Sequence, residues 1–223
     1  DLDAVKAVVN KAIDVPGLVS EPYDRDVLAF NEKVATSATG QEKENVRLVN
    51  AYRIMMGRQA VKLEERLTRA ARGHSIEMRD LNYFAHESPT PGKESPGKRC
   101  AIEGYSGGSE NIAFGSGFMN AKGAFDGWYH SSGHHRNMLG RGWTELGVGR
   151  ASRTSDTASY WTQNFGAMGG KSLKTPDALP PIRPEVAPER DPEDAAAAAA
   201  GDGGDAPDGR DPKAPPGPAP KDG

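Results

Sequence analysis

Ser109-Glu110-Asn111-Ile112-Ala113 is the first of three blocks that decide the fold of this chain. The second is Trp128–Leu139 (Trp-Tyr-His-Ser-Ser-Gly-His-His-Arg-Asn-Met-Leu), and the third is Tyr160–Gly166 (Tyr-Trp-Thr-Gln-Asn-Phe-Gly). The blocks bring a carboxylate and several imidazoles close together in sequence, and aromatic side chains flank them. Glu110 precedes apolar residues that we expect to be buried, and a buried carboxylate needs an ionic partner, hydrogen bonds or a metal. Glu110 and the histidines are therefore the first candidates for a functional site.

The segments around these blocks show helical and extended patterns. Residues 42–57 predict an amphipathic helix that ends at a glycine, and apolar residues three or four apart over 63–81 predict a second, longer helix. Residues 82–108 are rich in Pro, Gly, Ser and Lys and predict a loop. A short helix is expected over 121–130, and two antiparallel strands are expected over 146–150 and 159–165. Helices followed by antiparallel strands predict an α+β domain with helices covering a small sheet.

The two ends of the chain differ in composition from its middle. Residues 1–41 carry helical fragments interrupted by proline and glycine, and we interpret them as a partly helical connector. Residues 169–223 are rich in Pro, Ala, Gly and Asp and cannot bury enough apolar surface to offset their conformational entropy. We predict a disordered tail or linker there and a folded domain over 42–168. Because the chain begins at Asp1 without a Met, we interpret it as a mature or excised part of a longer precursor.

Charge, hydropathy and cysteine content exclude several classes of protein. A net charge of −3 gives no basic field for nucleic acid, so no nucleic-acid partner is predicted. No apolar run reaches the roughly 18 residues of a membrane span. The single cysteine, Cys100, excludes an intrachain disulfide. Lys98 and Arg99 beside it are able to lower a thiol pKa, but no other element of a thiol enzyme is present, so we expect a small buried apolar residue.

In their order and spacing, the three blocks resemble the bacterial branch of the CAP superfamily, which comprises cysteine-rich secretory proteins, antigen 5 and pathogenesis-related proteins. The resemblance covers a little over half of the chain. It implies an α-β-α sandwich with a small antiparallel sheet covered by helices. It also implies an exported domain, whether secreted, periplasmic or in the cell envelope. The family shares a cavity and not one agreed reaction, so the resemblance predicts shape better than biochemistry.

By this resemblance, the cavity residues can be assigned one by one. His86, after Tyr83-Phe84-Ala85, matches the first cavity histidine, and Glu110 matches the acid of the family's Gly-Glu-Asn block, although Ser109 replaces the glycine. His134 matches the histidine of the Ser-Pro-Gly-His-Arg-X-Asn block and is the second cavity histidine. Other positions that match the motifs are Asn111, Trp128, Arg136, Asn137, Tyr160 and Gln163.

The resemblance also shows which cavity residues are missing. Eukaryotic members use two histidines and two glutamates, but the second glutamate falls on Ser131 and one histidine falls on Tyr160 in this chain. His134 is a substitute for the lost imidazole. Two imidazoles from His86 and His134 and a carboxylate from Glu110 would then be the ligands of Zn²⁺ or another divalent cation, because three such ligands and a water complete an open tetrahedral site.

Some other patterns suggest enzymes but lack the required context. His130 and His134 have the spacing of a zinc-protease helix, but the glutamate of His-Glu-X-X-His is absent. Gly104–Gly108 matches a Gly-X-Ser-X-Gly elbow, but no helix is expected after it, so we predict a loop. His74 lies on an apolar stripe and is predicted to be a core or capping histidine. The aromatic residues are expected in the core. An alternative is that some of them line a groove that binds an apolar or glycan ligand.

These observations lead to one functional hypothesis and two alternatives. The hypothesis is a noncatalytic domain outside the cytoplasm that binds a divalent metal, or a small-molecule, lipid or cell-envelope ligand, in a His/Glu cavity. The first alternative is a hydrolase in which a histidine, His86 or His134, acts as base and Glu110 orients it. The second is a structural display domain with the tail as a spacer. The sequence leaves the oligomeric state and the ligand open.

Overall fold

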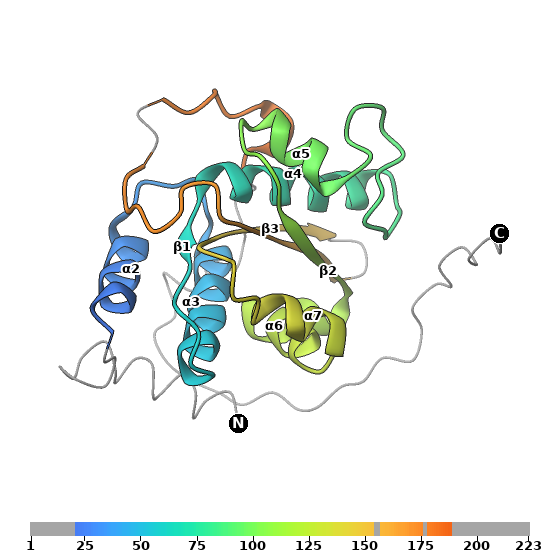
Figure 1. Cartoon of the computed structure of the whole chain (residues 1–223). Helices are drawn as coiled ribbons and strands as arrows, with labels where there is room; N and C mark the ends of the chain where they lie inside the picture. The colour runs from blue at the N-terminus through green and yellow to red at the C-terminus, as the bar shows by residue number, and fades with distance from the viewer. Residues whose placement is uncertain (1–20, 154–156, 176–177, 189–223) are drawn as a thin grey trace, which may run out of the picture.

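The structure is a computed structural model that describes residues 21–153, 157–175 and 178–188, and it has helices on both faces of a central sheet (Figure 1). The helices are α2 (Pro22–Lys33), α3 (Gly40–Met55), α4 (Glu65–Asp80), α5 (Pro96–Ile102), α6 (Ala121–Tyr129) and α7 (Ser132–Met138). The strands are β1 (Lys62–Leu63), β2 (Ser109–Gly115), β3 (Glu145–Arg153) and β4 (Ala158–Gly166), and the short 3-10 helices are η1 (Ser116–Phe118) and η2 (Pro184–Val186). The predicted α+β class and α-β-α sandwich are confirmed. The parts of the predicted connector and tail at 1–20 and 189–223 lie outside the described residues.

The sheet is mixed and has the strand order β1-β3-β4-β2. Strands β3 and β4 are antiparallel, as expected. The unexpected strand β2 pairs antiparallel with β4, and the two-residue β1 joins β3 in parallel. β2 lies at an edge of the sheet, with Glu110 opposite Asn164 and Asn111 opposite Gln163. Since successive side chains of a strand point to opposite faces, Glu110 and Asn111 face different helix layers.

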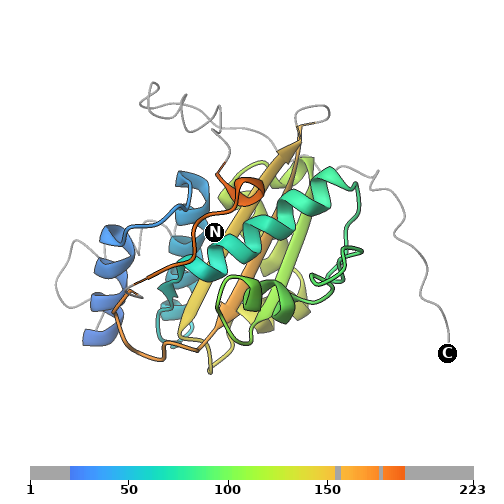
Figure 2. The ribbon, with the colours of Figure 1, turned by 90° about the horizontal axis from the view of Figure 1, so that it is seen from above.

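Helix α4 covers one face of the sheet, and α3, α6 and α7 cover the other (Figure 2). α4 lies so close to β3 that a Cβ atom on Gly147 would be 2.1 Å from the backbone of α4, and one on Gly149 would be 2.0 Å away. Only glycine permits this approach. The main core lies on the opposite face, where Trp128, Trp161 and Phe165 are fully buried.

Two segments differ from their sequence-based expectation. Residues 82–108 contain α5, which begins where Ser95 Oγ accepts a hydrogen bond from Lys98 N at 3.3 Å, with Pro96 in the first turn. α7 begins at Ser132 in spite of Ser-Ser-Gly, so His130 ends α6 whereas His134 lies on α7. The four-residue spacing of these histidines therefore does not place them on one helix face.

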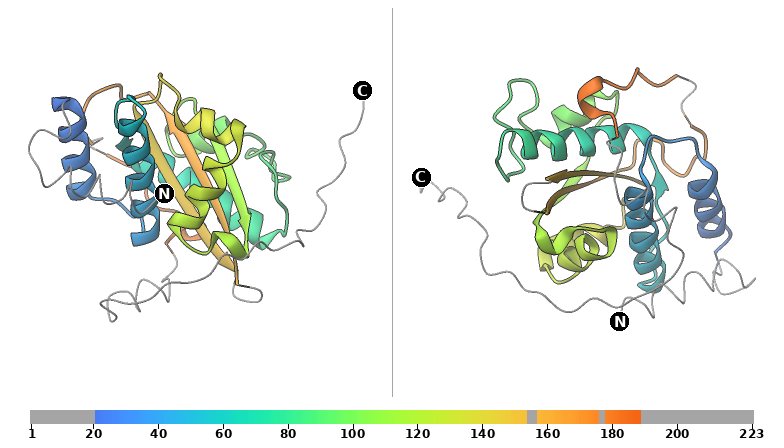
Figure 3. Two further views of the ribbon diagram at one scale, coloured as in Figure 1. Left: turned by 90° about the horizontal axis from the view of Figure 1, so that it is seen from below. Right: turned by 180° about the vertical axis from the view of Figure 1, so that it is seen from behind.

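The segment 178–188, part of the predicted tail, packs on the outer surface of α4 (Figure 3). Val186 is fully buried, and a Cβ atom on Gly73 would lie 2.8 Å from its Cγ1 atom. Arg183 pairs with the buried Glu103 at 2.5 Å. The composition of this segment predicted disorder, but the burial of Val186 and the ion pair of Arg183 attach it to the folded domain.

Candidate functional site

The centre of the candidate site is a hydrogen bond of 2.9 Å between His86 Nδ1 and Glu110 Oε1. The Glu110 side chain is 1% exposed and the His86 side chain is 45% exposed. A carboxylate only accepts hydrogen bonds, so His86 Nδ1 carries the proton and donates it. The other ring nitrogen, Nε2, then has a free lone pair in the neutral imidazole. The buried carboxylate therefore fixes both the orientation and the tautomer of a half-exposed histidine.

Arg99, on α5, holds this carboxylate in place. Its Nη2 atom donates to Glu110 Oε1 at 3.0 Å and to Oε2 at 2.8 Å, and it also donates to the backbone oxygen of His86 at 3.0 Å. The Arg99 side chain is only 3% exposed. The sequence analysis considered Arg99 only as a neighbour of Cys100 and missed this role. The sequence held only part of the signal, because a buried Glu110 requires a cation but nothing in the sequence identifies that cation as Arg99.

Two further side chains from α4 and β4 surround Glu110. The Asn164 amide, in the orientation that satisfies both its ends, donates to Glu110 Oε2 and accepts from Ala71 N, each at 3.2 Å. His74 is fully buried, with Nε2 3.0 Å from the Ala85 oxygen and 3.8 Å from Glu110 Oε1. His74 is thus the core histidine that the sequence predicted.

Glu77 on α4 anchors the loop that carries His86. Tyr83 donates its hydroxyl to Glu77 Oε2 at 2.7 Å. Burial opposes the ionisation of Glu77, but hydrogen bonds from His74, Thr90, Ser88 and Tyr83 outweigh it and lower the pKa of this carboxyl. The loop is therefore fixed on both sides of His86, by Glu77 on one and Arg99 on the other.

His134 lies on α7, in the opposite helix layer, and a chain of amides holds it there. Asn111 Nδ2 donates to the His134 backbone oxygen at 3.3 Å and to Gln163 Oε1 at 3.1 Å. Asn137 Nδ2 donates to Asn111 Oδ1 at 2.9 Å, and Gln163 Nε2 donates to Asn45 Oδ1 at 2.7 Å. The motif positions on β2, α7 and β4 thus form one buried polar network.

The His134 side chain is half-buried. Burial, and then the nearby His86, lower the pKa of His134 below its ordinary value. His134 is therefore neutral at neutral pH and has a lone pair available for a ligand. Trp128, another motif residue, donates from Nε1 to the Ile112 oxygen at 2.9 Å and so fixes α6 against the edge strand.

The three predicted metal ligands are not equally available. Glu110 has both oxygens occupied by Arg99, and His86 and Asn164 also bond to it. Among the residues described, no group of three or more His, Cys, Asp or Glu side chains is arranged to hold a metal. These hydrogen bonds occupy Glu110 as a partner of Arg99, His86 and Asn164, and do not fit it as a third metal ligand.

The remaining histidines lie apart from this site. His130 is 70% exposed and lies 3.5 Å from Asp126, on its own helix. His135 Nε2 is 2.8 Å from the Tyr52 hydroxyl, and its Nδ1 is 2.9 Å from the Tyr129 oxygen. Arg136, another motif position, donates to the Ser132 oxygen at 3.2 Å and thus stabilises α7.

Cys100 is fully buried on α5 behind Arg99. Burial and the nearby Glu110 raise the pKa of its thiol to about 12, against the smaller opposite effect of Arg99. Because a thiol nucleophile must ionise, Cys100 is inert at neutral pH. The Gly104–Gly108 loop is followed by β2 and not by a helix, so the nucleophile elbow is not formed.

A cavity of about 190 Å³ lies elsewhere, between α2, β1 and the segment around Lys174. Its walls include Phe30, Val34 and Leu63, and none of the candidate site residues. The cavity is therefore separate from the His86 site. Within the parts of the chain that the structure covers, no helix is long and apolar enough to cross a membrane.

Comparisons with known proteins extend these findings. The model of the Cysteine-rich secretory protein family (CAP) matches residues 46–165, more than half of the chain. The uncharacterized protein YkwD of Bacillus subtilis (strain 168) is 35% identical over 162 residues, covering 73% of this chain and 61% of that protein. The uncharacterized membrane protein YlbC of the same strain is 30% identical over 135 residues, covering 60% and 37%.

A solved structure is also similar to this chain. It is that of an extracellular protein containing a SCP domain from Bacillus anthracis str. Ames, with 31% identity and a TM-score of 0.51, covering 56% of this chain and 40% of that chain. The chain thus spans less than two thirds of the length of each of these relatives.

Proposed function

Since this chain belongs to the CAP family of cysteine-rich secretory proteins, we propose that it is a noncatalytic binding domain that acts outside the cytoplasm. The Bacillus anthracis protein with a similar structure is described as extracellular. The buried hydrogen bonds around Glu110 support a binding role, because they fix the orientation of the half-exposed His86 imidazole. A display domain would have no need of such an arrangement.

We infer that His86 and His134 together bind a divalent cation such as Zn²⁺. The single observation that carries this proposal is the hydrogen bond from His86 Nδ1 to Glu110, because metal-binding histidines commonly donate their second nitrogen to a carboxylate. His134 would be the second ligand, and its lowered pKa keeps it neutral as a ligand must be. Water or a group of an extracellular ligand would complete the coordination, so the cation would connect the domain to a small-molecule or cell-envelope ligand.

Zinc titration into the full chain by calorimetry tests this proposal. We expect binding by the wild type, loss of binding in His86→Ala and His134→Ala, and about 10- to 100-fold weaker binding in Glu110→Gln. His130→Ala is the matched control, because His130 is an exposed histidine outside the site. If zinc binds the wild type and both the His86→Ala and His134→Ala variants equally, the proposal is wrong. If the variants change stability alone and nothing binds, the display domain becomes the better description.

The same hydrogen bond supports a hydrolase as the second candidate. A carboxylate that fixes Nδ1–H leaves His86 Nε2 able to act as a general base toward water. Among the described residues, however, no serine, threonine or cysteine side chain bonds to His86, so a protein nucleophile is not in place. Turnover of a peptide or ester library that Glu110→Gln abolishes would favour this candidate. Turnover that survives the substitution would eliminate it.

A further inference from the structure

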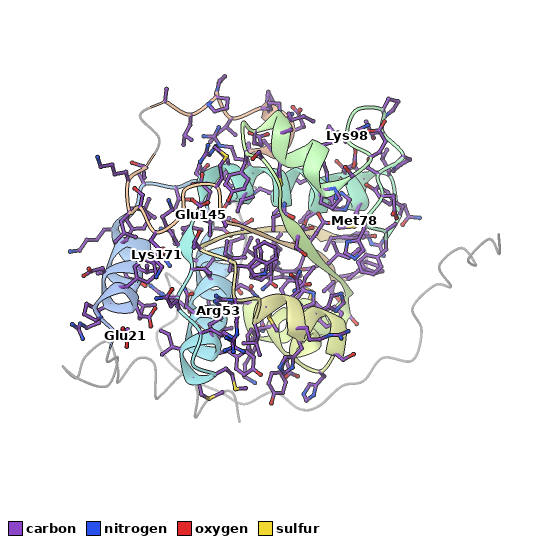
Figure 4. The ribbon with its side chains drawn as sticks, in the orientation of Figure 1. Glu21, Arg53, Met78, Lys98, Glu145 and Lys171 are labelled. Atoms are coloured by element: carbon purple, nitrogen blue, oxygen red, sulfur yellow. The ribbon has the colours of Figure 1, made fainter. Side chains whose placement is uncertain are left out.

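An exposed aromatic ring lies two residues before His86 on the same loop. Phe84 is 45% exposed, and its ring centroid is 5.9 Å from that of Phe114 on β2. Phe114 in turn stacks on Tyr160 at 4.2 Å, and Tyr160 is only 2% exposed. Met78, labelled in Figure 4, packs beneath this group with Tyr160. The three rings thus form a column that rises from the core on the α4 side of the sheet to the surface at Phe84.

Arg153, near the end of β3, fixes this aromatic column. Its guanidinium lies 5.1 Å from the Phe114 ring centroid and 5.6 Å from that of Tyr160. Its Nη1 atom donates to Asn82 Oδ1 at 2.9 Å and to the Tyr160 hydroxyl at 3.1 Å. Asn82 has a φ of +51° and forms the turn that leads into Phe84. The exposed ring is therefore held by the fold, which lowers the entropy cost of binding a ligand to it.

The aromatic column and the candidate site lie side by side along β2. Phe114 and Glu110 are four residues apart and point to the same face of the strand, about 13 Å from each other along it. Phe84 contacts Phe114, and His86 contacts Glu110. The loop of Phe84 and His86 thus follows the edge strand and presents one ring and one oriented imidazole in a single strip.

We propose that this strip binds a glycan, with Phe84 stacked on the apolar face of one pyranose ring. Aromatic rings carry a negative face that attracts the polarised C–H groups of a sugar. His86 Nε2 would accept a hydrogen bond from a sugar hydroxyl. This inference rests on the proposed role of His86 as a ligand-binding residue, and it adds the chemical class of the ligand.

The size of the apolar surface favours a sugar over a protein or a membrane. Of the large apolar side chains that are exposed in the described residues, only Leu81 and Phe84 belong to this loop. A stable protein interface buries about 800 Å² on each partner, and apolar interaction patches cover several hundred Å². Two side chains are too few for either. One aromatic ring and one hydrogen-bonding imidazole along the strand suit neighbouring sugar units of a glycan.

A panel of soluble tetrasaccharides at millimolar concentration tests the proposal by calorimetry on the full chain. The panel comprises tetramers of glucose, N-acetylglucosamine and galacturonic acid. We expect one of them to bind, and Phe84→Ala and Phe84→Leu to weaken binding at least about tenfold, which is about 1.4 kcal/mol. Phe84→Trp should retain binding, because it keeps the ring. Ile102→Ala is the matched control, since Ile102 is 41% exposed on α5.

Three results would overturn the proposal. They are no binding of any tetrasaccharide, equal binding by wild type and Phe84→Ala, and retention of full affinity by Phe84→Leu, which would show that size matters and not the aromatic face. Sedimentation with phosphatidylglycerol vesicles that depends on Phe84 would likewise assign the ring to a membrane surface. Zinc titration of Phe84→Ala separates this proposal from the proposed function, because the cation site should remain intact whether or not a sugar binds.

Discussion

Replacement of Arg99 by Met should destabilise the protein more than any exposed arginine substitution. The guanidinium of Arg99 is the cationic partner of Glu110, and both side chains are at most 3% exposed. Its loss leaves a buried carboxylate without its ion pair, and such a change costs about 3–5 kcal/mol. The backbone oxygens of His86 and Lys93 lose their donor as well. Against a typical total stability of about 5–15 kcal/mol, this loss is large.

Arg47→Met is a matched control for this effect. Arg47 also makes two hydrogen bonds to one carboxylate, that of Glu32 at 2.8 and 2.5 Å, but the two side chains are 49% and 40% exposed. Exposed pairs of this kind contribute about 0–1 kcal/mol. Both arginines make two hydrogen bonds to a single carboxylate, so their contrast tests the effect of burial on the ion pair.

Urea unfolding followed by tryptophan fluorescence and circular dichroism measures these differences. The double variant Arg99→Met with Glu110→Gln removes both charges, so its loss should be smaller than the sum of the single losses by at least about 1 kcal/mol. Two results would refute the reasoning. One is a loss in Arg99→Met no greater than in Arg47→Met, and the other is strict additivity in the double variant.

Three further predictions concern other parts of the fold. Because the pKa of Cys100 is raised to about 12, iodoacetamide should not modify the native protein at pH 8 until urea unfolds it, and rapid alkylation of the native protein would contradict this. The free energy of unfolding that the neutral thiol contributes should fall only as pH rises above about 8.5 toward 12. Gly147→Ala should prevent the contact of α4 with β3 and lower the midpoint of thermal unfolding sharply, whereas Gly133→Ala, which meets no atom within 4 Å, should be neutral or stabilising by up to about 1 kcal/mol. Val186→Ala should cost about 2 kcal/mol in urea unfolding, because the side chain is fully buried on α4; an unchanged midpoint would show that the segment 178–188 does not stabilise the domain.

Sequence reasoning predicted the elements with strong periodicity and missed those that depend on tertiary contacts. The helices α3, α4 and α6 and the strands β3 and β4 follow apolar patterns, and their existence was predicted correctly. β2 was missed because it is buried on both faces and its buried residues include the polar Glu110 and Asn111. Its sequence therefore shows no alternation of apolar and polar residues. α5 was missed because it is seven residues long and begins in a Pro-rich segment.

The candidate site shows the same limit. His86, Glu110 and His134 were named from the family resemblance, but the distances between them depend on how three segments fold around β2. Arg99 carries no motif of its own, and only its hydrogen bonds to Glu110 reveal its role. A buried acid in a motif therefore predicts that a cation will be found near it, but the sequence does not say which one.

The edge strand β2 explains why one short block of sequence controls both halves of the site. Its alternation sends Glu110 to the α4 layer, where it orients His86, and Asn111 to the opposite layer, where it holds the backbone of His134. Both halves would be lost together if the strand shifted by one residue, since every side chain would then change face. The register is fixed by Glu110 opposite Asn164, which bond to each other across the α4 face, and by Asn111 opposite Gln163, which bond across the other. Exchange of Glu110 and Asn111 in a double variant should therefore abolish zinc binding completely, and a variant that kept binding would show that the two imidazoles are positioned independently of this strand.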